Sequence, residues 1–265
     1  MKPVLTLITI AGMAMAAMPA HGEIINIATP STSLVLDATQ GQPLKIMHYG
    51  DRMTDADIDA LPSAGSINLN AYPVYGLNPQ GEAALSVTHT DGNRTTDLAV
   101  KGVTRTKDDG ADITTVTMAD TYYPLEVKVN YRTYPGDEVI ETWVDITNNE
   151  KGKVTLNRFM SGYLPVRYGD VWMSSLYGTW ADEANLTEEP LPHGVRMIKN
   201  KDGLRNTHTA HPEVMLSLDG KPRENNGRVI GAALCYPGNY KLFVDTDDSN
   251  FHHLFAGINE ENSWY

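Results

Sequence analysis

The sequence predicts an all-β fold, an antiparallel β-sandwich. The clearest observation is the segment Leu125–Met160, which begins with Leu125, Val127, Val129 and Tyr131 alternating with polar residues. Alternation with period two is typical of a half-buried strand. Turn residues recur about every eight to twelve positions along the chain, and helical periodicity is nearly absent. More than a dozen short strands separated by such turns favour a sandwich.

The same segment predicts a β-meander of three strands. Turn residues at 134–137 end the first strand, because Pro135 fixes φ and Gly136 is free to take positive φ. Alternation resumes over Val139–Ile146, a second turn follows, and Val154–Met160 forms the third strand. The polar positions carry Glu, Lys, Asp and Arg, so this sheet has one face in water, as antiparallel sheets can.

The rest of the chain repeats the pattern of short strands and turns. We expect further strands at Glu23–Ala28, Ser33–Leu36, Leu44–Tyr49, Leu85–His89, Leu98–Thr104, Ile113–Met118, Trp172–Leu176, Val195–Ile198, Leu204–Pro212, Val214–Leu218, Val229–Tyr236, Lys241–Asp245 and His252–Ile258. The turn Thr90–Asn93, with Asp-Gly at its centre, predicts a hairpin. No repeat of about 20–50 residues and no low-complexity linker occurs, so residues 23–265 are predicted to form one domain.

Residues 1–22 are predicted to be a secretory signal peptide. Lys2 is followed by the apolar run Val4–Met18 and by small residues before Glu23. The run is too short for an ordinary membrane span of about 20 residues. We therefore expect a mature chain that starts near Glu23, is exported to a periplasm or secreted, and is not a membrane protein. Cys235, the only cysteine, lies in an apolar strand and is expected to be a small buried hydrophobe.

Charge and motifs exclude several classes of function. The net charge of −12 over 265 residues argues against a nucleic-acid partner, whose phosphates call for a basic patch. No nucleophile elbow, P-loop or dinucleotide fingerprint is present. The aspartates of 51–59 lack the Gly and terminal Glu of an EF-hand loop, and Asp55–Leu61 is equally one turn of solvated helix. Adjacent His252 and His253 on one strand point to opposite faces. We predict no metal and no cofactor.

Aromatic residues lie in or beside predicted loops rather than in mid-strand. They are Tyr72, Tyr75, Trp172, Tyr177, Trp180, Tyr236 and Tyr240. Exported β-sandwiches with aromatic loops often handle sugars, whose C–H faces stack on rings. The alternative is that these residues pack at core corners and domain interfaces.

Several segments, in order along the chain, carry a resemblance to a known family. They are Thr32–Leu36, His48–Gly50, Tyr72–Gly76, Glu82–Val87, Asp91-Gly92, Val139–Trp143, Ile146–Asn148, Leu176–Glu183, Gly203–Pro212 and Gly231–Asn239. Their order resembles the N-terminal domain of family 36 glycoside hydrolases, the α-galactosidase (melibiase) family. Tyr240 stands where the family often has Trp, and Lys199–Gly203 is more charged than the family's serine-rich version, so the local loop contacts are expected to differ from the family's.

The resemblance implies a β-supersandwich similar to galactose mutarotases, placed before a TIM-barrel domain. In such a protein the barrel holds two catalytic aspartates, nucleophile and acid/base, of a retaining mechanism. A barrel needs about 250 further residues, so no catalytic residue is assigned to this chain. The end at Trp264-Tyr265 reads as the start of another element, and we expect a truncated piece of a longer α-galactosidase. The expected partners are that barrel, a galactose-containing oligosaccharide and, as an open possibility, further copies of the chain.

The resemblance also implies that this domain can line the sugar pocket, sometimes that of a neighbouring subunit. The long aperiodic stretch Asp51–Gln80 is the best candidate, because long ordered loops are often functional. The substrate-binding candidates are Asp51, Arg52, Tyr72, Tyr75 and Trp180. The alternative is that the loop only packs an interface.

Two other functions stay open at this point. One is a stand-alone carbohydrate-binding module, motivated by the aromatic loops. The other is an aldose-epimerase-like enzyme, which needs a His acid and a Glu base in one cleft; His89, His208 and His211 are the available histidines.

Overall fold

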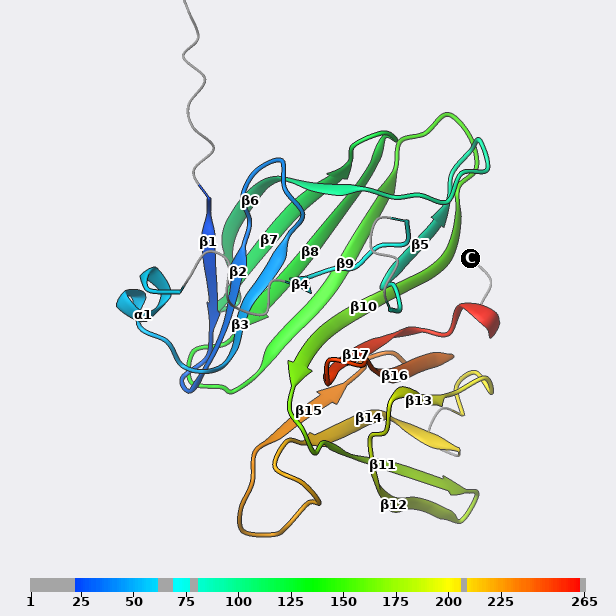
Figure 1. Ribbon diagram of the computed structural model, residues 1–265. Helices are drawn as coiled ribbons and strands as arrows, with labels where there is room; N and C mark the ends of the chain where they lie inside the picture. The colour runs from blue at the N-terminus through cyan, green and yellow to red at the C-terminus, as the bar shows by residue number, and fades with distance from the viewer. Residues whose placement is uncertain (1–21, 62–68, 77–80, 206–208, 263–265) are drawn as a thin grey trace, which may run out of the picture.

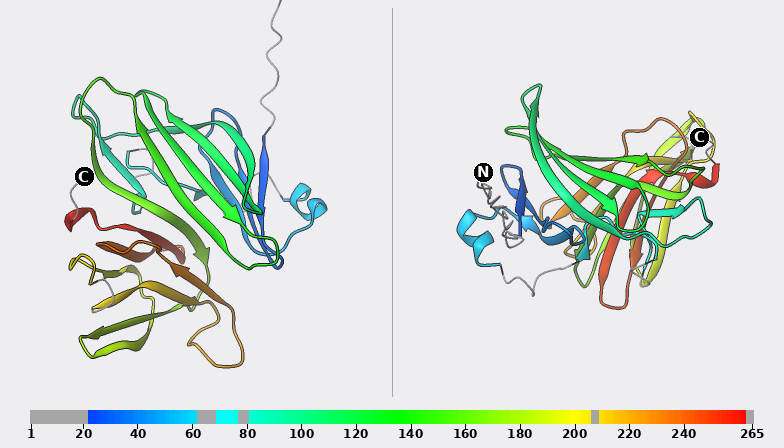
Figure 2. Two further views of the ribbon diagram at one scale, coloured as in Figure 1. Left: turned by 180° about the vertical axis from the view of Figure 1, so that it is seen from behind. Right: turned by 90° about the horizontal axis from the view of Figure 1, so that it is seen from above.

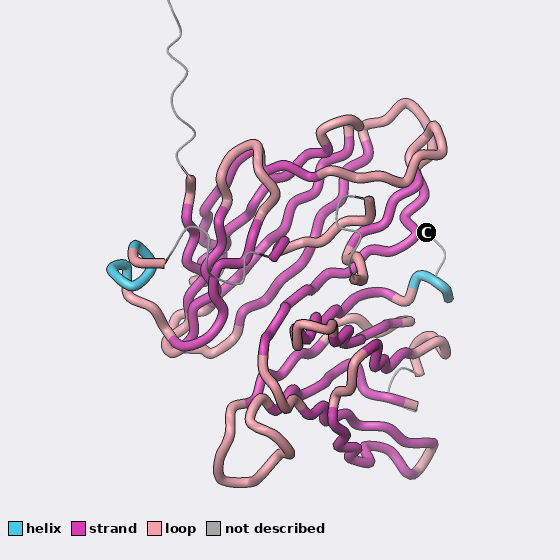
Figure 3. The backbone as a smooth tube through the Cα atoms, in the orientation of Figure 1, coloured by secondary structure: helices cyan, strands magenta, loops and turns pink. Residues whose placement is uncertain are grey.

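The protein is described by a computed structural model covering residues 22–61, 69–76, 81–205 and 209–262 (Figure 1). Strands dominate it, as the tube view in Figure 3 makes clear. The elements are β1 (Ile24–Ala28), β2 (Thr32–Asp37), β3 (Lys45–Asp51), α1 (Asp55–Asp59), β4 (Leu69–Asn70), β5 (Leu85–Thr88), β6 (Leu98–Asp108), β7 (Ala111–Asp120), β8 (Leu125–Thr133), β9 (Ile140–Asn148), β10 (Thr155–Arg167), β11 (Trp172–Thr179), β12 (Asp182–Pro190), β13 (Gly194–Lys199), β14 (Ala210–Ser217), β15 (Val229–Ala233), β16 (Tyr240–Thr246), β17 (Phe251–Ile258) and the 3-10 helix η1 (Glu260–Asn262). The predicted all-β class is confirmed. None of the described helices is long and apolar enough to cross a membrane.

The strands form four antiparallel sheets that pack in two pairs. The sheet β1-β2-β3-β4 lies against β6-β7-β8-β9, which curves around it (Figure 2). The five-stranded sheet β13-β16-β17-β10-β5 lies against β12-β11-β14-β15. Two hydrophobic cores result, one between the sheets of each pair, with the half-buried Tyr49 packed against both. The architecture is a supersandwich, as the resemblance implied.

The meander shows why its alternation predicts the fold. Leu125, Val127, Val129 and Tyr131 of β8 are all buried in the first core, while the intervening Glu126 and Lys128 remain partly in water and Asn130 is buried. Pairing with β9 brings Val129 opposite Val144, so the apolar faces of the two strands coincide. Burying these side chains stabilises the fold by about 25 cal/mol for each Å² of apolar area removed from water.

β10 joins the two halves of the molecule. The prediction ended this strand at Met160, but it continues to Arg167. Its first part pairs with β5 and its second part with β17, with register shifts at 156/158 and 160/162. Such bulges bend a strand and change its direction, so one strand can pair with partners in both halves of the molecule. Gly162 and Pro165, which interrupt the sequence pattern, lie within this bent strand.

Four further predictions can be compared with the structure. The turn at Thr90–Asn93 forms, with the His89 amide donating to the Asn93 carbonyl over 2.8 Å, but the predicted hairpin is wrong because β5 pairs with β10 and β6 with β7. Cys235 is exposed, not buried, because β15 ends at Ala233. The helical turn after Asp51 is confirmed as α1, with a capping box between Thr54 and Asp57. Part of the predicted strand Leu204–Pro212, including His208, lies outside the described residues.

Candidate functional site

Asp51 and Arg52 lie where β3 ends and the chain turns toward α1. Both are exposed. The Arg52 backbone amide donates to the Ser31 carbonyl over 2.7 Å, and its Nη1 donates to the Thr29 carbonyl over 2.5 Å. These bonds hold Arg52 against the β1–β2 turn, while its other guanidinium nitrogens make no hydrogen bond to the described residues. The two residues therefore offer an acceptor and a set of donors at the end of β3, as a sugar hydroxyl requires.

A loop from the second half of the molecule carries a guanidinium toward Asp51. Arg228 makes a bidentate ion pair with Asp219, with Nη2 2.6 Å from Oδ1 and Nε 3.1 Å from Oδ2. This hydrogen-bonded pair lowers the pKa of Asp219 to about 2. It also raises the pKa of Arg228, which the electrostatic influence of the Tyr168 hydroxyl and of Asp51 raises further. Local motifs do not reveal Arg228, because only the fold brings it within the electrostatic influence of Asp51.

The two candidate tyrosines have different environments. Tyr72 is buried in the first core, and its hydroxyl donates to the Met160 carbonyl over 3.0 Å. Burial raises its pKa above the ordinary value. Tyr72 therefore holds its segment against the core, and its side chain is not accessible to a ligand. Tyr75 is half exposed, and the Arg94 guanidinium lies over its ring at 4.6 Å from the centroid.

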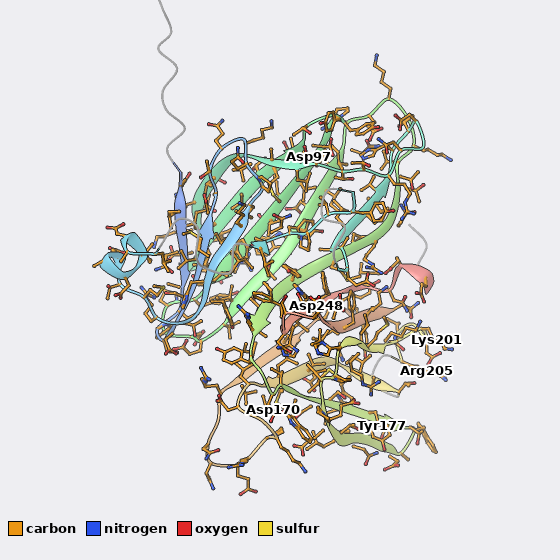
Figure 4. All side chains as sticks on the ribbon, viewed as in Figure 1. Asp97, Asp170, Tyr177, Lys201, Arg205 and Asp248 are labelled. Atoms are coloured by element: carbon orange, nitrogen blue, oxygen red, sulfur yellow. The ribbon has the colours of Figure 1, made fainter. Side chains whose placement is uncertain are left out.

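Trp180 lies at the β11–β12 turn, with 80% of its surface exposed. It borders an open cavity of about 500 Å³ lined by Gly178, Thr179, Trp180, Asp202, Arg205 and Thr209. Figure 4 shows the neighbouring Tyr177, Lys201 and Arg205 on this side of the molecule. In Figure 1 the β11–β12 hairpin and α1 lie at opposite sides. The predicted site residues therefore do not converge: Asp51 and Arg52 share one location, and Trp180 belongs to another.

Of the histidines available for an epimerase, the described ones, His89 and His211, pair with different glutamates, and His208 lies outside the described residues. His89 Nδ1 lies 2.7 Å from Glu150 Oε1, and both side chains are buried, with Tyr123 stacked on the imidazole at 3.7 Å. A His and a Glu are thus adjacent, but they bond to each other where no substrate reaches them. His211 Nδ1 is 3.7 Å from Glu213 Oε1.

A second histidine group links the hairpin between β16 and β17 to β10. His253 Nδ1 lies 2.9 Å from the Tyr163 hydroxyl, and its Nε2 lies 3.1 Å from Asp247 Oδ2. Burial, and to a smaller degree the charges of Asp247 and Asp245, raise the pKa of Tyr163. Both nitrogens of His253 are therefore satisfied within the protein.

Solved structures and curated proteins resemble this chain over most of its length. The galactosidase domain of the α-galactosidase–sucrose kinase AgaSK superposes with a TM-score of 0.80 at 23% identity, covering 91% of this chain and 38% of that one. The α-galactosidase from Lactobacillus brevis superposes with a TM-score of 0.78 at 24% identity, covering 91% and 36%. At these identities the superpositions show the fold alone.

Sequence comparison gives the family. The bifunctional α-galactosidase/sucrose kinase AgaSK of Mediterraneibacter gnavus is 27% identical over 218 residues, 77% of this chain and 22% of its own length. The α-galactosidase Mel36A of Lactobacillus acidophilus is 29% identical over 216 residues, 77% of this chain and 29% of its own length. The chain thus spans less than a third of these relatives. The profile of the glycosyl hydrolase family 36 N-terminal domain matches residues 42–265, and the chain belongs to that family.

Proposed function

We propose that this chain is the non-catalytic N-terminal domain of an exported α-galactosidase that removes terminal α-galactosyl residues from oligosaccharides. The observation that carries the proposal is the family match over residues 42–265, together with relatives named as α-galactosidases that are three to four times longer. The catalytic carboxylates belong to the part of those proteins that this chain does not match. Its role is to support a catalytic barrel.

Asp51 and Arg52 are the residues by which this domain contacts the sugar. The support for this is their exposure together at the end of β3, with one guanidinium nitrogen anchored and the carboxylate free of hydrogen bonds to described residues. An anchored donor together with an unpaired acceptor discriminates between sugars, because a substrate lacking the matching hydroxyl leaves polar groups unpaired. Tyr75 extends this surface only as far as its contact with Arg94 allows.

Two measurements test the proposal. The coding DNA beyond codon 265 should continue in frame into a barrel-forming sequence, and a stop codon in an intact gene would refute the fragment. In the protein with its catalytic part attached, Arg52→Lys should raise KM for raffinose about ten-fold, because an ammonium cannot reproduce the forked geometry. Arg105→Lys, at an exposed surface ion pair with Glu23, is the matched control and should leave KM unchanged.

Export is tested separately. The residues before Glu23 have the order of a cleavable secretory leader. The protein recovered from the periplasm or medium of its host should begin near Glu23 by N-terminal sequencing. An intact Met1 in a cytoplasmic fraction would contradict this part of the proposal.

A further inference from the structure

The cavity beside Trp180 has the features of a small ligand site of its own. Its volume of about 500 Å³ lies within the range of about 300–1,000 Å³ typical of such sites. It is formed by two segments far apart in sequence, the end of β11 with its turn and the segment after β13. It lies on the side where Figure 4 places Tyr177 and Arg205, whereas Asp51 and Arg52 follow β3 toward α1, which lies at the opposite side in Figure 1.

One wall is aromatic and held by a tight hairpin. Trp180 and Tyr177 are both exposed rather than folded into the core. The turn that carries Trp180 is fixed by Ala181 in the left-handed region (φ 63°) and by its amide donating to Glu183 Oε1 over 2.9 Å. Gly178 is required beneath it, since a Cβ there would lie 2.3 Å from the Asp182 carbonyl oxygen. An exposed indole on a constrained turn loses little entropy when a flat ligand stacks on it.

The opposite wall is polar and is held by a buried amide network. Asn200, almost wholly buried, donates to the carbonyls of Gly203 and Gly238 over 2.8 and 3.1 Å and accepts from the Asp202 amide over 3.1 Å. Asn259 donates to the Asn200 carbonyl over 3.1 Å. Four hydrogen bonds thus fix the backbone that carries Asp202 and Arg205, and hydrogen-bonded networks of this kind rigidify a structure.

The charged side-chain groups on that wall have no partner among the described residues. The Asp202 carboxylate and the Arg205 guanidinium make no hydrogen bond or ion pair to any described residue, although both line the cavity. Asp offers only acceptors and Arg only donors. A ligand with several hydroxyls satisfies both, whereas a phosphate would be repelled by Asp202 and by the acidic turn at Asp182-Glu183.

We propose that this cavity binds a pyranose unit of a galactosyl oligosaccharide, separately from the Asp51–Arg52 surface. The C–H face of the ring stacks on Trp180, hydroxyls donate to Asp202, and other hydroxyls accept from Arg205. The site holds the substrate chain near the enzyme without reacting with it. Only the choice of a galactosyl unit rests on the proposed function; the stacking and hydrogen-bonding chemistry rests on the cavity itself.

Calorimetry on the purified chain tests the proposal with melibiose and raffinose as probes and maltose as the comparison sugar. We expect millimolar binding of the galactosides, at least about ten-fold weaker in Trp180→Ala and about five- to ten-fold weaker in Asp202→Asn. Tyr122→Ala is the matched control, because Tyr122 is equally exposed (76%) on the β7–β8 turn of another sheet. It should bind as the parent chain does.

The outcomes separate the site from its alternatives. Absence of heat with all three sugars, or equal affinity in Trp180→Ala, would overturn the site. Tighter binding of maltose through the same residues would overturn the galactosyl choice. If Trp180→Ala instead lowers the mass measured by light scattering and leaves sugar binding unchanged, the indole contacts a second copy and the proposal fails. None of these results depends on whether a catalytic barrel follows, so the proposed function is tested independently.

Discussion

A buried ion pair fastens the last described helix to the five-stranded sheet. Lys241 Nζ on β16 lies 2.5 Å from Glu260 Oε1 on η1, and the Lys241 side chain is 1% exposed against 13% for Glu260. Arg158 Nε lies 3.6 Å from the same carboxylate oxygen. Removing the carboxylate therefore leaves a desolvated ammonium without its nearest counter-charge.

The expected cost follows from this burial. Breaking a buried pair by removing one partner costs about 3–5 kcal/mol. Because Glu260 keeps some exposure, we expect about 3 kcal/mol for Glu260→Ala, near the lower limit. For a chain of this size that lowers Tm by about 6–12 °C. Lys241→Met removes the buried charge but keeps the length of the side chain, and Arg158 still faces Glu260, so it should cost about 1 kcal/mol or less.

Urea unfolding of four variants tests the reasoning. The double variant K241M/E260A should be more stable than Glu260→Ala alone, by about 2 kcal/mol, because the stranded charge is gone. The neighbouring pair Lys199–Glu261, 2.8 Å apart with side chains 42% and 56% exposed, supplies the control. Glu261→Ala should cost less than about 1 kcal/mol. If Glu260→Ala costs no more than Glu261→Ala, or if Lys241→Met fails to rescue it, the buried pair does not stabilise η1.

Three further outcomes follow from the described contacts. Burial holds the pKa of His252 below its ordinary value, so below about pH 6.5 the unfolded chain binds more protons than the folded chain and stability falls as pH drops. Tm measured from pH 7.5 to 5 should therefore fall less steeply in His252→Asn than in the parent chain, and an identical slope would contradict this role of His252. Gly178→Ala should cost about 1–3 kcal/mol in urea unfolding, since its Cβ meets backbone, and an unchanged midpoint would contradict the tight hairpin. Tyr72→Phe should cost about 1–2 kcal/mol by leaving the Met160 carbonyl unpaired while leaving sugar affinity unchanged; a loss of affinity would place Tyr72 in a binding site.

Local pattern predicted the regular strands because their burial follows the pleat. Val127 and Val129 are buried where the alternation places them. It missed β12, whose sequence Asp182–Pro190 is polar, since that strand lies at a sheet edge and is specified by pairing with β11. It also ended β10 early, because bulges that let a strand change partners look like breaks in the pattern.

The candidate site was less accessible to sequence reasoning. Loop position identified Trp180 as an aromatic outside the core, yet the same criterion selected Tyr72, which is buried. The difference depends on which sheet covers each ring, and this tertiary packing cannot be read from the local sequence pattern. Asp202 and Arg205 were missed because they reach the cavity only through the amide network around Asn200.

The claim that catalysis resides in a barrel and not in this domain is tested most directly by hydrolysis of p-nitrophenyl α-galactoside. The purified chain should release no p-nitrophenol above buffer, and the same chain continued by its barrel should turn the substrate over. Turnover by the chain alone, co-purifying with it and free of contaminating enzyme, would contradict the account, because it would place the catalytic carboxylates within this domain.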